Sequence, residues 1–146
     1  MTTRTGHCLC GAVRLVARDV PATATVCHCR MCQRWTGSAY HEVSVPTTQV
    51  DWQGETITVF ASSHLGERAF CGTCGSHLYF RVTQEGPWSG NYDIPLGLFD
   101  DTQGITLAAE IFVDEKPDAY AIADCGQLRL TRADVIEKFA DIETVG

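Results

Sequence analysis

Cysteine spacing is the feature that most constrains how this chain can fold. Two cysteines one or two residues apart can bind one metal ion from a single tight turn, and zinc prefers a tetrahedron of soft ligands such as thiolates. The spacing therefore favours metal ligation over disulfides. Seven of the eight cysteines form three such clusters: Cys8 and Cys10; Cys27, Cys29 and Cys32; Cys71 and Cys74.

The first and third clusters resemble each other because a glycine follows each of them, Gly11 and Gly75. Glycine lets the backbone turn so that amide N–H groups can point at sulfur. A metal that joins the two clusters closes a loop of about 60 residues, which should stabilise the fold strongly. We therefore predict one structural zinc ion with four ligands: Cys8, Cys10, Cys71 and Cys74.

The middle cluster differs, since Cys27, Cys29 and Cys32 offer three ligands within six residues and no glycine follows. Three protein ligands and one open position are typical of a catalytic zinc, whose open position holds water or a substrate thiol. If Cys29 and Cys32 begin a helix, its N-terminus favours their thiolate forms. Cys125 is a possible fourth ligand that would close the site, although a buried or free thiol is the simpler interpretation.

Other interpretations of the cysteines stay open. They could be small buried residues, or Cys29-Arg-Met-Cys32 could be a redox dithiol, although such motifs usually follow a strand in a βαβ unit. A labile zinc and oxidisable thiols would indicate a redox or metal-handling protein. The strongest alternative is a non-catalytic zinc-binding module that binds a protein partner, which a closed second site would favour.

Size and composition limit the remaining possibilities. A chain of 146 residues that is 45% hydrophobic fits a single domain, residues 1–146. It has no run of about 18 apolar residues and no apolar leader, so we expect a cytoplasmic protein with reduced thiols and no membrane partner. The net charge of -7 and the lack of a basic run argue against nucleic-acid binding. Nothing in the sequence specifies an oligomeric state.

Short strands dominate the pattern of hydrophobic residues. Three apolar residues, Val13, Leu15 and Ala17, alternate with Arg14 and Arg18, which is the period of a half-buried strand. Turn signals separate the runs at 51–54, 86–90 and 100–104. The further strands that we predict are 56–60, 77–82, 94–99 and 107–113.

Two helices are expected. Thr131 and Asp134 form a capping pattern ahead of an apolar face made by Val135, Ile136, Phe139 and Ile142. A shorter helix is expected from about Cys29 to Trp35.

Several other side chains near the clusters are candidates for a role. His28 stands between two predicted ligands, so its side chain should point away from the metal, into a supporting contact, toward a substrate or into solvent. Trp88 is the aromatic residue that we expect to face a pocket. Four arginines can pair with a substrate carboxylate, although an exposed charge without a role is the simpler interpretation of each: Arg30, Arg34, Arg68 and Arg81.

These motifs together resemble the glutathione-dependent formaldehyde-activating enzyme family, also called the Gfa or centromere-protein-V family. The resemblance spans roughly residues 6 to 120, and the combined cysteine pattern carries its specificity. The matching segments are Gly6–Val13, Cys27–Cys32, Thr36–Ser38 and Arg68–Ser76, with a looser match at Glu110–Asp114 and Tyr120.

The resemblance implies a mainly β, Mss4-like fold with few short helices and zinc-clamped β-hairpins. It also implies two zinc ions, with the same division into a structural site and a catalytic site at Cys27, Cys29 and Cys32. The implied activity is that of a zinc-dependent carbon–sulfur lyase acting on thiol–aldehyde adducts of the S-hydroxymethylglutathione type. The expected partners are then a small-molecule thiol and an aldehyde, or their adduct.

Overall fold

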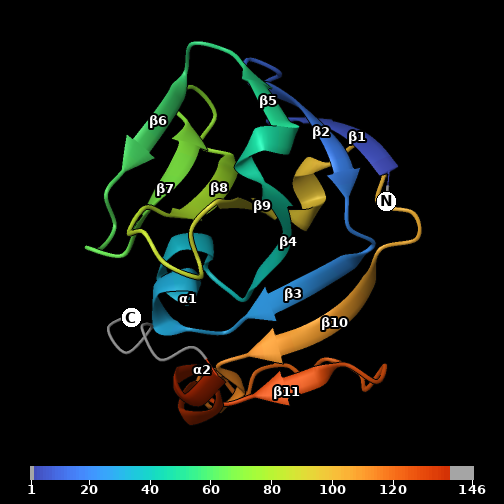
Figure 1. The fold of residues 1–146 in the computed structure, drawn as a ribbon, viewed down its shortest axis with the longest axis vertical. Coiled ribbons are helices and arrows are strands. Elements are labelled where there is room, and N and C mark those ends of the chain that lie inside the picture. The colour runs from blue at the N-terminus through green and yellow to red at the C-terminus, as the bar shows by residue number, and fades with distance from the viewer. Residues whose placement is uncertain (1, 139–146) are drawn as a thin grey trace.

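The computed structural model describes residues 2–138, and strands dominate them (Figure 1). The strands are β1 (Thr2–His7), β2 (Arg14–Val20), β3 (Thr23–Cys27), β4 (Tyr40–Pro46), β5 (Val50–Gln53), β6 (Ile57–Phe60), β7 (Gly66–Cys71), β8 (His77–Val82), β9 (Asn91–Pro95), β10 (Thr106–Ile111) and β11 (Leu128–Leu130). The helices are α1 (Arg30–Thr36) and α2 (Arg132–Lys138), with 3₁₀ turns η1 (Thr47–Gln49), η2 (Leu96–Leu98) and η3 (Val113–Glu115). The predicted mainly β fold with few short helices is confirmed.

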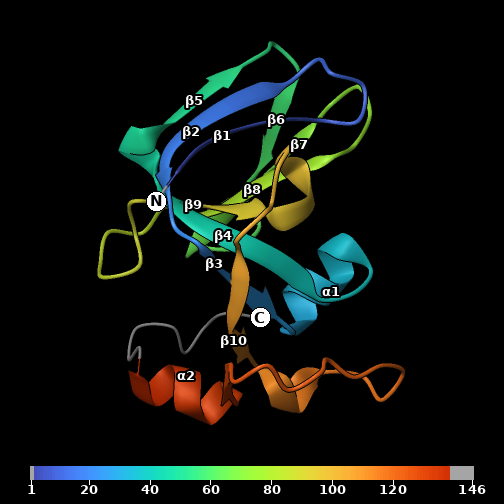
Figure 2. The ribbon, with the colours of Figure 1, turned by 90° about the vertical axis from the view of Figure 1, so that its right-hand side faces the viewer.

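The strands form two sheets. The smaller sheet has the order β1-β2-β5, and the larger has the order β11-β10-β3-β4-β9-β8-β7-β6. Neighbouring strands are antiparallel except around β10, which pairs in parallel with both β3 and β11. Figure 2 shows the small sheet at the same end of the molecule as β6 to β9, with β10 and α2 at the other end.

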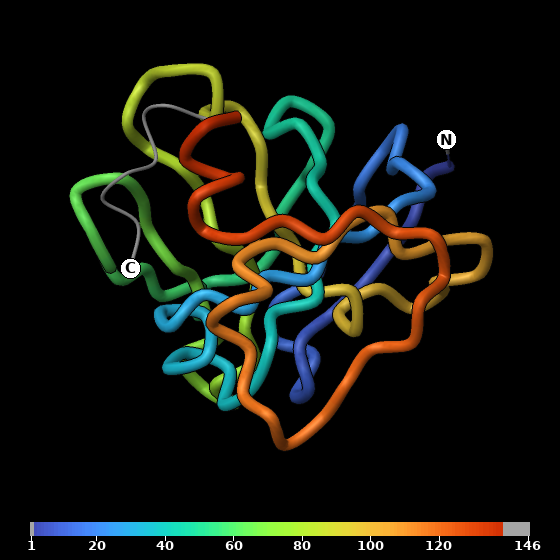
Figure 3. The backbone as a smooth tube through the Cα atoms, turned by 90° about the horizontal axis from the view of Figure 1, so that it is seen from below, coloured from blue at the N-terminus to red at the C-terminus, as the bar shows by residue number. Residues whose placement is uncertain are grey.

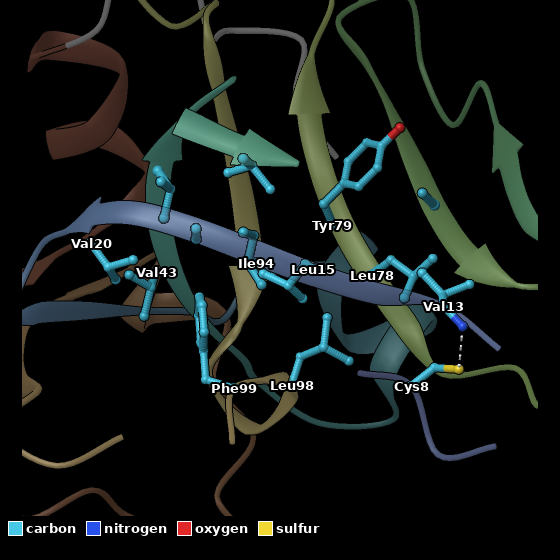
Figure 4. Packing of buried hydrophobic residues seen from close by; sticks show 14 of the residues in the cluster. Cys8, Val13, Leu15, Val20, Val43, Leu78, Tyr79, Ile94, Leu98 and Phe99 are labelled. Atoms are coloured by element: carbon cyan, nitrogen blue, oxygen red, sulfur yellow. Dashed lines mark hydrogen bonds between the residues drawn. The ribbon is translucent and has the colours of Figure 1, made fainter. Parts of the chain in front are cut away.

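The main hydrophobic core lies where the small sheet packs on the larger one (Figure 4). Leu15 and Ala17 on alternate positions of β2 are buried, as the period of two predicts. They meet Val43 of β4, Leu78 of β8 and Ile94 of β9, and each large side chain buried in this way stabilises the fold by about 1.5–3 kcal/mol. Cys8 and Cys71 belong to the same core, so two predicted ligands are part of the main packing.

A second, smaller core contains the middle cysteine cluster. Its buried members are Cys27, Cys29, Cys32, Tyr40, Phe112 and Val135. Figure 3 shows the orange connection from β10 to β11 running beside the light-blue helix α1 before it swings into a wide loop. Gln33 ties the two together, because its side-chain amide donates to the Glu115 carbonyl at 2.8 Å.

Both expected helices are present among the described residues. In α1, Cys29 caps the N-terminus by accepting from the Cys32 amide, and Gly37 at φ 83° ends the helix. In α2, the Thr131 amide donates to Asp134 Oδ2 and the Asp134 amide donates to Thr131 Oγ1, as the capping pattern predicts. The predicted apolar positions 139 and 142 lie outside the described residues.

Two local predictions are wrong. The expected strand 94–99 ends at Pro95 and continues as η2, because proline has no N–H to extend the ladder. This turn lets Leu98 pass so close to β1 that a side chain on Gly6 would lie 2.4 Å from the Leu98 carbonyl oxygen. The expected turn 51–54 is instead mostly β5, which pairs with β2.

Strand β10 also differs from the simple alternating pattern. It ends at Ile111, and Phe112 adopts a left-handed conformation at φ 56°, so the predicted strand 107–113 is two residues too long. Glu110 is a charged residue between the apolar Ala109 and Ile111, yet it is only 3% exposed. The reason is that β11 and the connection before it cover this face. No helix in the described part of the chain is long and apolar enough to cross a membrane.

Candidate metal centres

The first centre gathers four cysteines from two distant turns. Cys8 and Cys10 lie in the turn between β1 and β2, whereas Cys71 ends β7 and Cys74 follows in the next turn. All four sulfurs lie within 4.8 Å of one another. The Sγ of Cys10 is 3.6 Å from that of Cys8 and 3.9 Å from that of Cys71. Two sulfurs bound tetrahedrally to one zinc at 2.3 Å lie about 3.8 Å apart, so the donor set fits zinc.

Backbone and hydroxyl groups around this first centre are directed at its sulfurs. Gly11 at φ 79° and Gly75 at φ 77° turn the chain after each pair, a conformation that glycine adopts without strain. The Val13 amide then donates to Cys8 Sγ at 3.3 Å. Ser76 Oγ lies 3.2 Å from Cys74 Sγ, and bonds from Ser76 lower the pKa of the Cys74 thiol to about 5. These groups favour the thiolate that a metal requires.

The second centre gathers Cys27, Cys29 and Cys32 at the junction of β3 and α1. Their sulfurs also lie within 4.8 Å of one another. Cys27 ends β3, Cys29 caps α1 and Cys32 follows one turn later, so a single strand-to-helix transition supplies all three. Their exposures are 6%, 1% and 5%, which makes this a sheltered centre.

The three thiols of the second centre do not ionise independently. Hydrogen bonds from Cys27 and Cys32 lower the pKa of Cys29 well below its ordinary value, and the charge of Arg68 acts in the same direction. The bonds to Cys29 and Cys32 in turn raise the pKa of Cys27. A divalent cation is what allows three such neighbours to be thiolates together.

Cys125 belongs to neither centre. It is exposed, and it lies in the connection between β10 and β11. Its backbone amide donates to Gln127 Oε1 at 2.7 Å. Within residues 2–138, the second group therefore contains three cysteines and no fourth His, Cys, Asp or Glu.

A pocket of about 310 Å³ adjoins the second centre through Arg68. Arg68 lines this pocket, and its Nη2 lies 3.9 Å from Cys32 Sγ. The pocket is lined by Arg30, Met31, Arg34, Trp35, Phe60, Ser62 and Arg68. The aromatic rings in this lining are those of Trp35 and Phe60, whereas Trp88, the aromatic predicted to face a pocket, is not among them. Arg81 is not part of this lining either, and it forms an ion pair with Glu67 at 3.0 Å.

His28 is fully buried behind the second centre, so the possibility that it is solvated is wrong. Its Nε2 donates to Glu110 Oε1 at 2.9 Å, and its Nδ1 lies 3.3 Å from the Tyr120 hydroxyl. Glu110 also accepts from Gln127 Nε2 at 2.9 Å and Arg129 Nε at 3.1 Å. This network anchors the residue between Cys27 and Cys29 to β10 and β11.

The network around Glu110 predicts a pH-dependent contribution to stability. Burial alone would raise the pKa of Glu110, but bonds from Gln127, His28 and Arg129 outweigh it and lower the pKa. The stabilisation is therefore present above the unfolded-state pKa and is lost as the pH falls through the lowered native value. Glu110→Gln should reduce the free energy of unfolding by about 1–3 kcal/mol at neutral pH, a decrease of roughly 3–10 °C in Tm.

Thermal melts of wild type and Glu110→Gln across a pH series test this. Metal loss at low pH affects both proteins, so the difference between their melting temperatures isolates Glu110. The difference should shrink below about pH 4. Glu55→Gln, at an exposed position, serves as the matched control and should melt like wild type. An equal difference at all pH values would contradict the role of the ionised carboxylate.

Sequence reasoning missed two further carboxyl groups, of which Glu42 interacts with the cysteines of the second centre. Burial, the charge of Asp93 and the charge of Cys29 raise the pKa of Glu42 well above its ordinary value. Burial raises the pKa of Asp93 to about 6, although a hydrogen bond from Ser44 opposes it. The two residues lie on adjacent strands, β4 and β9. No local motif marks them, because the two carboxyl groups come together only through the pairing of strands that are distant in the sequence.

The fold and the two cysteine groups define a mainly β protein that can hold metal ions at two places. The chain belongs to the glutathione-dependent formaldehyde-activating enzyme family, whose family model matches residues 3–115. A Schizosaccharomyces pombe protein named an uncharacterized lyase is 34% identical over 119 residues, which cover 82% of this chain and 85% of that protein. A crystal structure of a Rhodobacter sphaeroides protein superimposes with a TM-score of 0.54 at 20% identity, covering 87% of this chain and 99% of that one. The likeness to this structure concerns the fold alone.

Proposed function

We propose that the protein is a zinc-dependent carbon–sulfur lyase-like enzyme that acts on thiol–aldehyde adducts. The observation that carries this proposal is the second centre, where three sulfurs gather without a fourth ligating side chain among the described residues. Three protein ligands leave one position for a substrate. Family membership and the relative named a lyase support the same reaction class.

A zinc ion held by Cys27, Cys29 and Cys32 would supply a Lewis acid that lowers the pKa of a bound thiol. In the synthetic direction the substrate thiol loses its proton, and its sulfur forms a bond to the aldehyde carbon. The carbonyl π bond breaks, and the oxygen takes up a proton to become a hydroxyl. Cleavage reverses each change, so no oxidant or reductant is required.

The chain's own side chains would hold and shelter the reactants. The pocket beside Arg68 provides apolar contacts from Met31, Trp35 and Phe60 for the body of a substrate. His28 and Glu110 hold the backbone between Cys27 and Cys29 in place. The burial of the three cysteines limits access of water to the reacting sulfur.

An exchange assay tests this function. Formaldehyde and a small thiol form a hemithioacetal spontaneously, and magnetisation-exchange NMR measures the rate of interconversion. Zinc-loaded wild type should accelerate the exchange, and Cys27→Ser should lose roughly 100-fold or more, since loss of even an outer-shell partner costs 10–100-fold. Cys125→Ala should retain the wild-type rate. Exchange at the spontaneous rate for glutathione and for simpler thiols alike would refute the proposed function.

A non-catalytic zinc-binding protein-interaction module is the second candidate. The observation in its favour is the low exposure of the three sulfurs, between 1% and 6%, which restricts direct access. In that case the exchange assay would show no acceleration, and the second centre would not respond to added thiols.

A further inference from the structure

We propose that Arg68 is an electrostatic positioning residue that enables the second centre to accept a fourth, negatively charged sulfur ligand. This inference rests on the proposed function and concerns a side chain outside the cysteine set. Arg68 comes from β7, whereas the cysteines come from β3 and α1. Its guanidinium reaches across to place Nη2 3.9 Å from Cys32 Sγ.

The surroundings of Arg68 hold its charge in a buried position. The residue is 5% exposed, and its guanidinium carbon lies 5.4 Å from the Trp35 ring centroid and 4.7 Å from that of Phe80. Nη1 donates to Ser62 Oγ at 2.6 Å, whereas Nε has no hydrogen-bond partner among the described residues. A buried guanidinium is costly unless an opposite charge accompanies it.

Among the described residues, the group that can carry an opposite charge at hydrogen-bond distance from Arg68 is the Cys32 sulfur. None of the ion pairs between described residues includes Arg68. Two further ionisable side chains act electrostatically on Cys29. Arg132 also bonds Glu115, at 2.8 Å and 3.1 Å, which offsets its charge. Glu42 also interacts electrostatically with Arg68, which lowers the pKa of its carboxyl group, although burial, the largest cause, raises that pKa well above its ordinary value.

Counting charges shows what Arg68 would contribute. Three thiolates and a divalent cation sum to -1, and a fourth thiolate makes the sum -2. Arg68 brings these sums to 0 and -1, so it favours the four-sulfur state within a sheltered, low-dielectric site. Arg68 also lines the 310 Å³ pocket, so a ligand that approaches Cys32 from there meets this charge first.

The test compares an anionic and a neutral ligand at the same open position. Cobalt-substituted protein is titrated with 2-mercaptoethanol, which binds as a thiolate, and separately with imidazole, which binds without charge. Visible absorption reports both affinities. Arg68→Met should weaken thiol binding by roughly 10- to 100-fold, the range for losing a hydrogen bond to a charged group. Imidazole affinity should change by less than about threefold, because no charge is added.

Two variants separate charge from structure. Arg68→Lys keeps a cation at this position and should restore most of the thiol affinity, which a purely structural role of the planar guanidinium would not allow. Arg18→Met removes a charge from the surface of β2, where Arg18 pairs with Asp51, and should leave both affinities unchanged.

The outcomes distinguish this inference from the proposed function. Equal weakening of thiol and imidazole in Arg68→Met would assign Arg68 a structural role and overturn the inference, as would unchanged thiol affinity. If Arg68→Met does not fold, the thiol affinity of Arg68→Lys tests the inference alone. Affinity close to that of wild type would support a role for the charge, and a large loss of affinity would contradict it. A wild-type centre that binds neither ligand would refute the proposed function together with this inference.

Discussion

Cys71→Ser should unfold the protein, whereas Cys29→Ser should leave the fold largely intact. Cys71 is fully buried, and its centre ties the turn after β1 to the end of β7. Structural zinc sites contribute about 10–16 kcal/mol of apparent binding free energy, which equals or exceeds the whole stability of a typical domain, about 5–15 kcal/mol. The loss of one of the four ligands at such a site should therefore prevent stable folding.

The second centre places smaller demands on the fold. All three of its cysteines come from one short segment, so a metal there closes no long loop. Serine is itself a favoured residue at the helix N-cap position that Cys29 occupies. We therefore expect Cys29→Ser to keep α1 and lose the metal.

Circular dichroism, thermal melts and elemental analysis of both variants check this prediction. Wild type should contain two zinc ions per chain, and Cys29→Ser should contain one and melt within a few degrees of wild type. Cys71→Ser should lack a cooperative melt. The reverse result, with Cys29→Ser unfolded and Cys71→Ser intact, would exchange the roles that we assign to the two centres.

Much of the architecture follows from local patterns. The aromatic and β-branched residues of the run 77–82 predict β8 at its observed bounds, and the Thr131–Asp134 pattern predicts the start of α2. The cysteine spacing predicts which sulfurs share a turn. A glycine follows each of two cysteine pairs, and this shared feature predicts that Cys8 and Cys10 meet Cys71 and Cys74. Both glycines, Gly11 and Gly75, adopt the left-handed conformation that glycine permits.

Other parts of the site depend on contacts between distant segments. Glu110 occupies a position that its own strand marks as polar and exposed, but β11 and Gln127 cover it. Arg68 reaches Cys32 only because α1 packs near β7. Parallel pairing of β10 with β3 likewise joins segments that no turn signal connects. Such placements arise from tertiary packing, which periodicity in a single segment does not encode.

Cobalt spectroscopy shows directly whether the second centre keeps an open coordination position. We expect this centre to bind a metal through three cysteine sulfurs and to keep one position exchangeable. Cobalt–thiolate bands report the number of sulfur ligands, and cobalt in the four-cysteine centre provides an internal reference. The protein should first be loaded with two cobalt ions per chain.

Glutathione or a simpler thiol is then added to wild type and to Cys125→Ala. We expect the bands of one cobalt to change from three-sulfur to four-sulfur ligation in both proteins, while the other cobalt is unaffected. A second centre that already shows four sulfurs, loses one of them in Cys125→Ala and responds to no thiol would contradict the open site.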